Sequence, residues 1–442
     1  MKRASVAFVL WLLACGTPSQ PSSASATQEP STAPLAEPSA LPPSASGNPA
    51  ALPQAPAPAP VVATNAGVDT RRAHATAAAP HACVLDRPLP SRVWATPGAA
   101  SVAARHGSVW VTGYATDDHG VTNVYVVSVN DEGHASPLYR ATLAGSTGDG
   151  SRIRTAAPRL LPLSTGRLLL LAVDGRGALL ATLLDASLPT AGGAMRPIAE
   201  HVDLRFPPAV AEFSEHLFIS YTDGSATPMR AFLITTDLVL NGAMSRDLTP
   251  AGMGGASPVW FPRENGSTLL FVDAHGGLSP LVSTDAEPGG ATSEVRVERA
   301  LSTIAEPAQI AAASIGRDAY VAYVAIGRAA TSAVGLVKLG NNNPPVAIVP
   351  GIGYGSSHVS AVSLGHGIVF AADAPPPPDS HAARHLVLRA FDQAGLGEAL
   401  NIASPEPGAN YIDIAAVSDN DVQIVWTTDA AVYVTSAHCS LL

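Results

Sequence analysis

The sequence predicts an all-β fold built from about seven copies of one four-stranded unit, preceded by a long unstructured segment. The unit is clearest in Gly266–Asp285, where Thr268–Asp273 is a short apolar run ending on an aspartate and Leu278–Thr284 is a second, alternating run. Turn-forming residues separate the two runs, which predicts two antiparallel strands joined by a tight turn. The pattern recurs with a period of about 50 residues, a length that suits one blade of a β-propeller.

The recurring apolar run divides residues 81–442 into seven units. A first strand, often introduced by proline, precedes the run in most units, and another strand follows it. The seven runs are Gly107–Tyr114, Gly166–Asp174, His216–Asp223, Thr268–Asp273, Asp318–Val324, Gly367–Asp373 and Asp421–Asp429. A single seven-bladed β-propeller is therefore predicted, with six or eight blades as alternatives because unit boundaries read from one sequence are imprecise.

The charge of the chain argues against two classes of partner. Charged residues make up 14% of the 442 residues, and the formal net charge is -10. No cluster of lysines and arginines is present, so neither nucleic acid nor an anionic membrane surface is expected to bind. We expect a monomer.

The N-terminus has the features of an export signal. Lys2 and Arg3 precede the apolar run Val6–Ala14, which is well short of the roughly 20 residues needed to span a bilayer. The sequence Leu12-Leu13-Ala14-Cys15-Gly16 resembles the lipobox of bacterial lipoproteins. This resemblance implies that residues 1–14 are a signal peptide and that Cys15 is acylated on its thiol and new amino group. An ordinary signal peptide with a chance cysteine is the alternative. The absence of aspartate after Cys15 favours the outer membrane under that family's sorting rules, facing the periplasm or the cell surface.

Residues 15–80 are predicted to form a disordered tether. They are rich in Pro, Ala, Ser and Thr, with few charges and almost no aromatics, so they cannot bury enough apolar surface to offset chain entropy. The alternating Ala55–Pro60 favours an extended polyproline II conformation. Such a tether holds the folded part, residues 81–442, away from the membrane.

The two ends of the folded part are expected to close the propeller. The last unit has about three strands, whereas Cys83–Leu85 and Arg92–Ala95 belong to no unit. A strand from the N-terminal end would complete the last blade and bring Cys83 beside Cys439. A disulfide between these two cysteines is expected in an exported protein, with two free or intermolecular thiols as the alternative.

The folded part, about four-fifths of the chain, resembles the divergent β-propeller repeats of bacterial exported proteins. No signature of a specific propeller family is present: there is no Trp-Asp ending, no sialidase-type Asp box and no Asp-rich calcium loop. The resemblance therefore carries over no functional residues. Aspartates that close corresponding strands are interpreted as turn caps that bind backbone N–H groups two residues on; they are Asp174, Asp223, Asp273, Asp373 and Asp429.

Three short motifs have features of chemical sites, but each favours a structural interpretation. His381 and His385, with Asp379 before them, have the spacing of a zinc pair, but the glutamate of a His-Glu-x-x-His motif is absent and a solvated loop is favoured. Gly351–Gly355 is glycine-rich, but no helix follows it to bind a phosphate, so a turn between blades is favoured. Ser356-Ser357-His358 are sequence neighbours, which does not make a catalytic triad.

Two further sets of residues have open alternatives. Asp117–His119 and Asp149–Arg152 lie in long early connections and are interpreted as solvated turns, with cation or sugar binding as the alternative. Trp110, Trp260 and Trp426 are expected in the core, with a stacking platform for sugars as the alternative.

The leading functional hypothesis is a non-enzymatic binding or scaffold module of the cell envelope, whose partner is an envelope protein or a polysaccharide. No catalytic or metal-ligating residue is assigned, no cofactor is expected, and the binding residues are not identified. One alternative is a glycan-active propeller enzyme, a hydrolase or lyase with carboxylates and arginines at the central pore. The other is a sensor domain for a small ligand.

Overall fold

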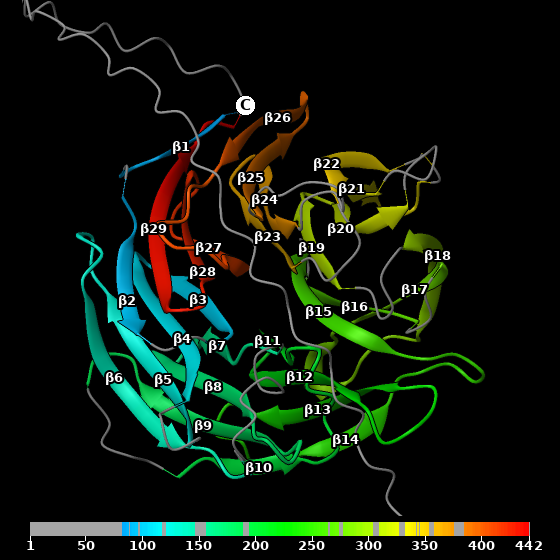
Figure 1. Cartoon of the computed structure of the whole chain (residues 1–442). Helices are drawn as coiled ribbons and strands as arrows, with labels where there is room; N and C mark the ends of the chain where they lie inside the picture. The colour runs from blue at the N-terminus through cyan, green and yellow to red at the C-terminus, as the bar shows by residue number, and fades with distance from the viewer. Residues whose placement is uncertain are drawn as a thin grey trace, which may run out of the picture. The chain divides into compact units, whose positions relative to one another are not determined.

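A computed structural model describes residues 82–441, apart from residues 88, 96–97, 117–120, 146–155, 189–193, 264–265, 274–276, 304–308, 327–331, 342, 344, 353–357 and 375–383. All of them lie in one compact unit, Ala73–Leu442. The predicted all-β fold with seven blades is confirmed, since the strands form seven antiparallel blades around a central channel (Figure 1). The described part holds strands and one short 3₁₀ turn, η2 (Pro288–Gly290), and none of its helices is long and apolar enough to cross a membrane.

Each blade runs from an inner strand at the channel to an outer strand at the rim. The inner strands are β3 (Ala100–Arg105), β7 (Arg159–Pro162), β11 (Ala209–Phe213), β15 (Ala256–Arg263), β19 (Ile310–Ile315), β23 (His358–Leu364) and β27 (Asn410–Ala416). The second strands are β4 (Ser108–Thr116), β8 (Arg167–Val173), β12 (His216–Asp223), β16 (Gly266–Val272), β20 (Asp318–Ile326), β24 (Gly367–Ala374) and β28 (Asp421–Thr427). The third strands are β5 (Thr122–Val129), β9 (Leu179–Asp185), β13 (Arg230–Asp237), β17 (Gly277–Asp285), β21 (Ser332–Lys338), β25 (His385–Asp392) and β29 (Ala431–Cys439). The outer strands of the first six blades are β6 (Ala135–Thr142), β10 (Arg196–Ala199), β14 (Met244–Asp247), β18 (Arg296–Thr303), β22 (Val346–Ile352) and β26 (Gly395–Asn401).

The core of the fold lies between neighbouring blades. Among the described residues, each of the seven interfaces has its own cluster of buried apolar side chains. A second strand is covered on both faces, which explains its mostly apolar sequence. In β8, for example, Leu168–Leu171 are all 0% exposed.

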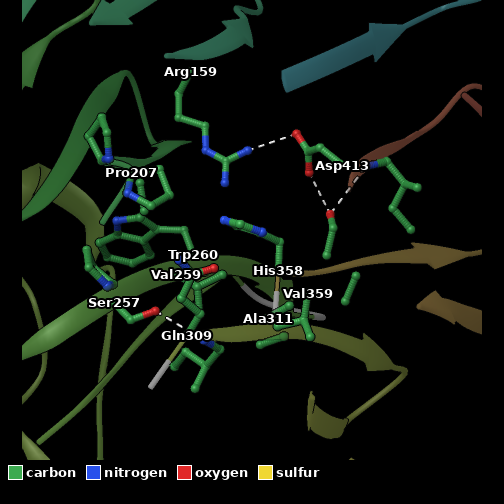
Figure 2. Close-up of a pocket in the computed structure, with 18 of the residues that line it drawn as sticks. Arg159, Pro207, Ser257, Val259, Trp260, Gln309, Ala311, His358, Val359 and Asp413 are labelled. Atoms are coloured by element: carbon green, nitrogen blue, oxygen red, sulfur yellow. Dashed lines mark hydrogen bonds and ion pairs between the residues drawn. The ribbon is translucent and has the colours of Figure 1, made fainter. Parts of the chain in front are cut away.

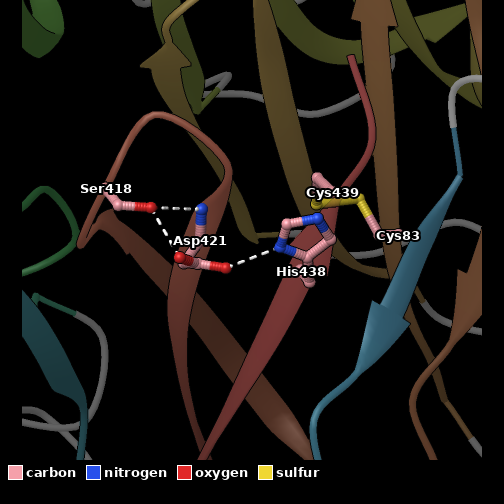
Figure 3. The surroundings of a disulfide bond; sticks show 5 residues. All are labelled: Cys83, Ser418, Asp421, His438 and Cys439. Carbon is pink, nitrogen blue, oxygen red and sulfur yellow. Dashed lines mark hydrogen bonds and ion pairs between the residues drawn. A yellow bond between two sulfur atoms is a disulfide. The ribbon is translucent and has the colours of Figure 1, made fainter.

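The seventh blade is completed by the N-terminal end of the domain, as the sequence predicts. β1 (Cys83–Leu85) and β2 (Ser91–Ala95) both pair with β29, so two short strands share the outermost position. Cys83 faces Cys439 in the register of β1 and β29, and a disulfide joins them (Figure 3). Both cysteines are buried among side chains of the sixth and seventh blades.

Two features of the fold were not predicted. The first blade has an inner strand of its own, β3, whose small residues give no strong apolar run. The fourth and fifth blades are linked at one residue pair, since Thr303 of the outer strand β18 pairs with Ala325 of the second strand β20, and the two blades therefore form one eight-stranded sheet.

Candidate functional site at one mouth of the central channel

The inner strands all point the same way along the channel. Between the first two blades, Ser101 Oγ donates to the carbonyl of Pro158 at 2.6 Å, and Arg105 Nη1 donates to the carbonyl of Pro162 at 2.9 Å. The same step of four residues on both strands means that they run in parallel. The N-terminal ends of the inner strands therefore meet at one mouth of the channel, and their C-terminal ends meet at the other.

A cavity of about 220 Å³ occupies the mouth at the N-terminal ends (Figure 2). All seven inner strands, or the residues just before them, contribute to its lining. Arg159 begins β7 and His358 begins β23, whereas Gln309 comes directly before β19. The fold thus brings together side chains that are about 50 to 250 residues apart in the sequence.

The carboxylate of Asp413 connects four blades. Its Oδ2 accepts hydrogen bonds from Arg159 Nη1 at 2.9 Å and from the backbone N–H of Val102 at 3.2 Å. Its Oδ1 accepts from the hydroxyl of Ser360 at 2.6 Å. Asp413 is only 6% exposed, and its charge is compensated by the guanidinium of Arg159 and by the other two donors.

A second buried carboxylate, Asp373, fixes the imidazole of His358. Asp373 is 0% exposed and accepts from the backbone N–H groups of His358 and Tyr411. His358 Nδ1 lies 3.0 Å from Asp373 Oδ2. An ionised carboxylate only accepts hydrogen bonds, so Nδ1 carries the proton in this contact. The other ring nitrogen, Nε2, is not used by Asp373 and is available to another group. Arg384 Nη1 lies 3.8 Å from the same carboxylate.

Tyr411 packs against the His358 ring and closes this side of the site. The two ring centroids are 4.2 Å apart, and the Tyr411 hydroxyl accepts from the backbone N–H of Ala157 at 2.6 Å. Burial raises the pKa of Tyr411 to about 12. The phenol therefore remains neutral over the physiological range and acts as part of the scaffold. Its backbone has a positive φ of 55°, a conformation that few non-glycine residues adopt.

Two polar groups that face the cavity have no partner among the described residues. Neither the amide of Gln309 nor the rest of the Arg159 guanidinium makes a hydrogen bond within the described part of the chain. Figure 2 shows the His358 imidazole and the Arg159 guanidinium between Asp413 on one side and Trp260 with Pro207 on the other. The cavity thus has a polar wall and an apolar wall.

The structure divides the predicted aspartate caps into two kinds. Asp174 accepts from the backbone N–H groups of Arg176 and Ala178, both at 2.9 Å, and Asp223 accepts from Ser225, so these two cap turns as predicted. Asp373 does not, because its carboxylate binds the starts of two inner strands instead.

Asp273 and Asp429 both contact a loop that leads into an inner strand, and the residue two positions beyond Asp273 lies outside the described residues. Asp273 accepts from the backbone N–H of Gly254, which lies just before β15. The Asp429 carboxylate lies against Gly408, where any Cβ would meet it at 2.2 Å. In three of the five blades, the aspartate that ends the second strand therefore contacts the start of an inner strand or the loop before it.

The three tryptophans are placed differently. Trp110 and Trp426 are buried in the core, as expected. Trp260 is half-buried and lines the cavity, with Nε1 donating to Ser220 Oγ at 2.8 Å. The position of Trp260 keeps the sugar-platform alternative open for this residue.

The remaining motifs fall largely outside the described residues. These motifs are Asp117–His119, Asp149–Arg152, Gly353–Gly355, Ser356-Ser357, Asp379 and His381. His385 begins strand β25, so its backbone is extended and the helical spacing of the zinc pair does not apply. Within the described residues, no group of three or more His, Cys, Asp or Glu side chains is arranged to hold a metal ion.

The site residues Arg159, Asp413 and Gln309 were missed by sequence reasoning, and His358 was discounted. The site residues come from different blades and are far apart in the sequence, so they form no local motif. One signal was present: Arg159, His358 and Asp413 are polar residues at or near the starts of predicted first strands. Once first strands are assigned to the channel, such residues become candidates.

Fold and site together define a β-propeller protein with a polar cavity at one channel mouth. The chain matches no protein-family model. It matches no curated protein sequence. Among solved structures it is similar to the BP39L lectin from Burkholderia pseudomallei, with 15% identity, a TM-score of 0.53, and coverage of 78% of this chain and 96% of the lectin. AofleA from Arthrobotrys oligospora gives 11% identity and a TM-score of 0.42, with coverage of 72% and 90%. A thermostable family-43 glycoside hydrolase gives 11% identity and a TM-score of 0.38, with coverage of 73% and 98%. At these identities the similarities concern the fold alone.

Proposed function

We propose that the protein is a non-enzymatic binding module of the bacterial cell envelope, whose propeller holds its partner at the cavity-bearing channel mouth. One observation carries the proposal. The polar wall contains charges that are already neutralised by protein partners, and beside them it contains polar groups that have no partner in the described part of the chain. Asp413 and Asp373 are each held by several protein donors. Groups fixed in this way orient a ligand without changing their own bonding.

The N-terminal sequence supports the envelope location. The lipobox resemblance at Leu12–Gly16 implies a lipid on Cys15, and residues 15–80 have the composition of a tether. A propeller at residues 81–442 then acts at a distance from the membrane, most simply the outer membrane. The partner is an envelope protein or a polysaccharide, and the lectin identity of one fold relative favours a polysaccharide.

The proposal is tested with the full-length acylated protein, purified in detergent and immobilised as bait. Solubilised envelope proteins and, separately, cell-wall and capsular polysaccharides are passed over it. Retention of one protein near one-to-one, or of a polysaccharide at unchanged length, is expected. Retention with shortening of the polysaccharide would overturn the non-enzymatic assignment. A urea-denatured and reduced sample of the same protein is the control for non-specific retention.

A second candidate is a glycan-active enzyme, favoured by one observation. The channel mouth holds a histidine backed by a buried carboxylate, His358 and Asp373, beside the pair Arg159 and Asp413. A backed histidine is a common general base. If this candidate is right, the wild-type protein shortens a retained polysaccharide and His358→Gln retains it uncut.

A further inference from the structure

We infer that the cavity at the channel mouth binds a single neutral sugar ring, an inference that rests on the proposed binding function and names its ligand class. The reasoning starts from the two walls. Arg159, Gln309 and His358 present polar groups, whereas Pro207 and Trp260 present apolar surface. A pyranose has the matching character, because its hydroxyl groups lie around the edge of a ring whose faces carry C–H groups.

The polar wall offers donors and acceptors together. The guanidinium of Arg159 keeps N–H groups that Asp413 does not use, since only Nη1 bonds that carboxylate. The Gln309 amide both donates and accepts. His358 Nε2 is an acceptor while the ring is neutral, because Asp373 holds the proton on Nδ1. A hydroxyl group donates one hydrogen bond and accepts others, so neighbouring sugar hydroxyls satisfy such a mixed set, whereas a deprotonated anionic oxygen only accepts.

The charges around the cavity favour a neutral ligand. Arg159 is neutralised by Asp413 at 2.9 Å, and Asp373 lies against His358 at 3.0 Å with Arg384 at 3.8 Å. An anion bound to Arg159 would share that guanidinium with the Asp413 carboxylate and be repelled by it. A neutral hydroxylated ring uses the remaining N–H groups without disturbing the ion pair.

The size of the cavity limits the ligand to about one ring. Its volume of about 220 Å³ is below the roughly 300–1,000 Å³ of sites that enclose drug-sized ligands. Trp260 is fixed by its bond to Ser220 Oγ and by packing against Phe218, with ring centroids 5.6 Å apart. A rigid indole supplies contact area at small conformational cost.

The experiment titrates the full-length protein with small probes by isothermal calorimetry and saturation-transfer NMR. The neutral probes are the methyl glycosides of glucose, galactose, mannose and N-acetylglucosamine; glucuronate and inorganic phosphate are the charged probes. Binding of at least one neutral glycoside is expected, with no binding of phosphate. Binding of glucuronate or phosphate alone would overturn the inference, as would no binding of any probe.

Two variants locate the site. Gln309→Ala removes a side chain that bonds no described residue, so the fold is retained, and it is expected to weaken the glycoside about tenfold through one lost hydrogen bond. Arg105→Gln, at the other end of the inner strands, is the matched control and leaves affinity unchanged. Unchanged affinity in Gln309→Ala would place the sugar elsewhere and overturn the inference, even if the bait experiment still retains an envelope partner. Shortening of a polysaccharide in that experiment would instead refute the non-enzymatic function.

Discussion

Replacing Asp413 should destabilise the propeller by an amount that depends on what replaces the carboxylate. Asp413→Ala removes the acceptor of three donors, from Arg159, Val102 and Ser360. Asp413 is buried but Arg159 is partly exposed, so the cost is the sum over three donors that lose their acceptor, at about 1–3 kcal/mol for each one that stays buried. We expect a loss of about 3–5 kcal/mol in the free energy of unfolding.

Asp413→Asn should cost much less. The asparagine oxygen can take the position of Oδ2 and accept from Arg159 and Val102. Its NH₂ group can then donate to the Ser360 hydroxyl, which already accepts from the backbone N–H of Ile414 at 3.3 Å. The contacts are kept, but the bond between residue 413 and Ser360 reverses its direction, the Ser360 O–H loses its acceptor and the charge is lost, so a cost of about 1–2 kcal/mol is expected.

Urea unfolding at pH 7, followed by circular dichroism with the disulfide intact, measures both variants. Asp421→Ala is the control, since Asp421 is a partly exposed aspartate bonded to His438 and Ser418, and its loss should cost under about 1 kcal/mol. An Ala variant within about 1 kcal/mol of wild type would refute the reasoning. An Asn variant as unstable as the Ala variant would also refute the reasoning, because it would show that keeping a hydrogen-bond acceptor at this position does not stabilise the fold.

Three further predictions concern the closure, the pH dependence and the anchor. The double variant Cys83→Ser/Cys439→Ser should lose about 2–6 kcal/mol in the free energy of unfolding, because the disulfide closes a loop with a sequence separation of 356. Its urea midpoint should fall accordingly, and a midpoint equal to that of the wild type would contradict this. The pKa of Tyr411 is raised by burial to about 12, above the ordinary value near 10. The folded state therefore holds this proton more tightly, and its stabilising effect is complete below about pH 10 and lost between about pH 10 and 12. The melting temperature should fall in that window, and a fall just as steep in Tyr411→Phe would argue against this cause. Cys15→Ala should move the protein from the membrane to the soluble fraction and abolish labelling by radioactive palmitate, whereas membrane retention would contradict lipidation.

The strands that pack between two blades were the predictable part of the fold. Gly166–Asp174 and Asp421–Asp429 were recognised because both faces of such strands are covered, so their sequences are mostly apolar. The outer strands were not recognised. Residues Met244–Asp247 of β14 are all exposed, so nothing in their sequence distinguishes a strand from a loop.

The site was not predictable in the same way. Arg159, His358 and Asp413 interact or lie near one another only because the inner strands of three blades meet around the channel. Asp373 was noticed for its position at a strand end, but its role required the neighbouring blade that supplies the N–H of Tyr411. Side chains that share no local sequence pattern become a site through closure of the ring.

The location of the disulfide has a mechanical consequence. The described chain begins at Ala82, one residue before Cys83, and the disulfide joins Cys83 to Cys439, the last residue of β29 in the seventh blade. Tension applied through the preceding residues is therefore carried by a covalent bond into β29, which lies between β28 and the two N-terminal strands. The three residue pairs of β1 are spared from bearing that load. A pull on the chain is resisted by the whole blade, and a reducing environment would convert the same pull into peeling of β1 from the edge.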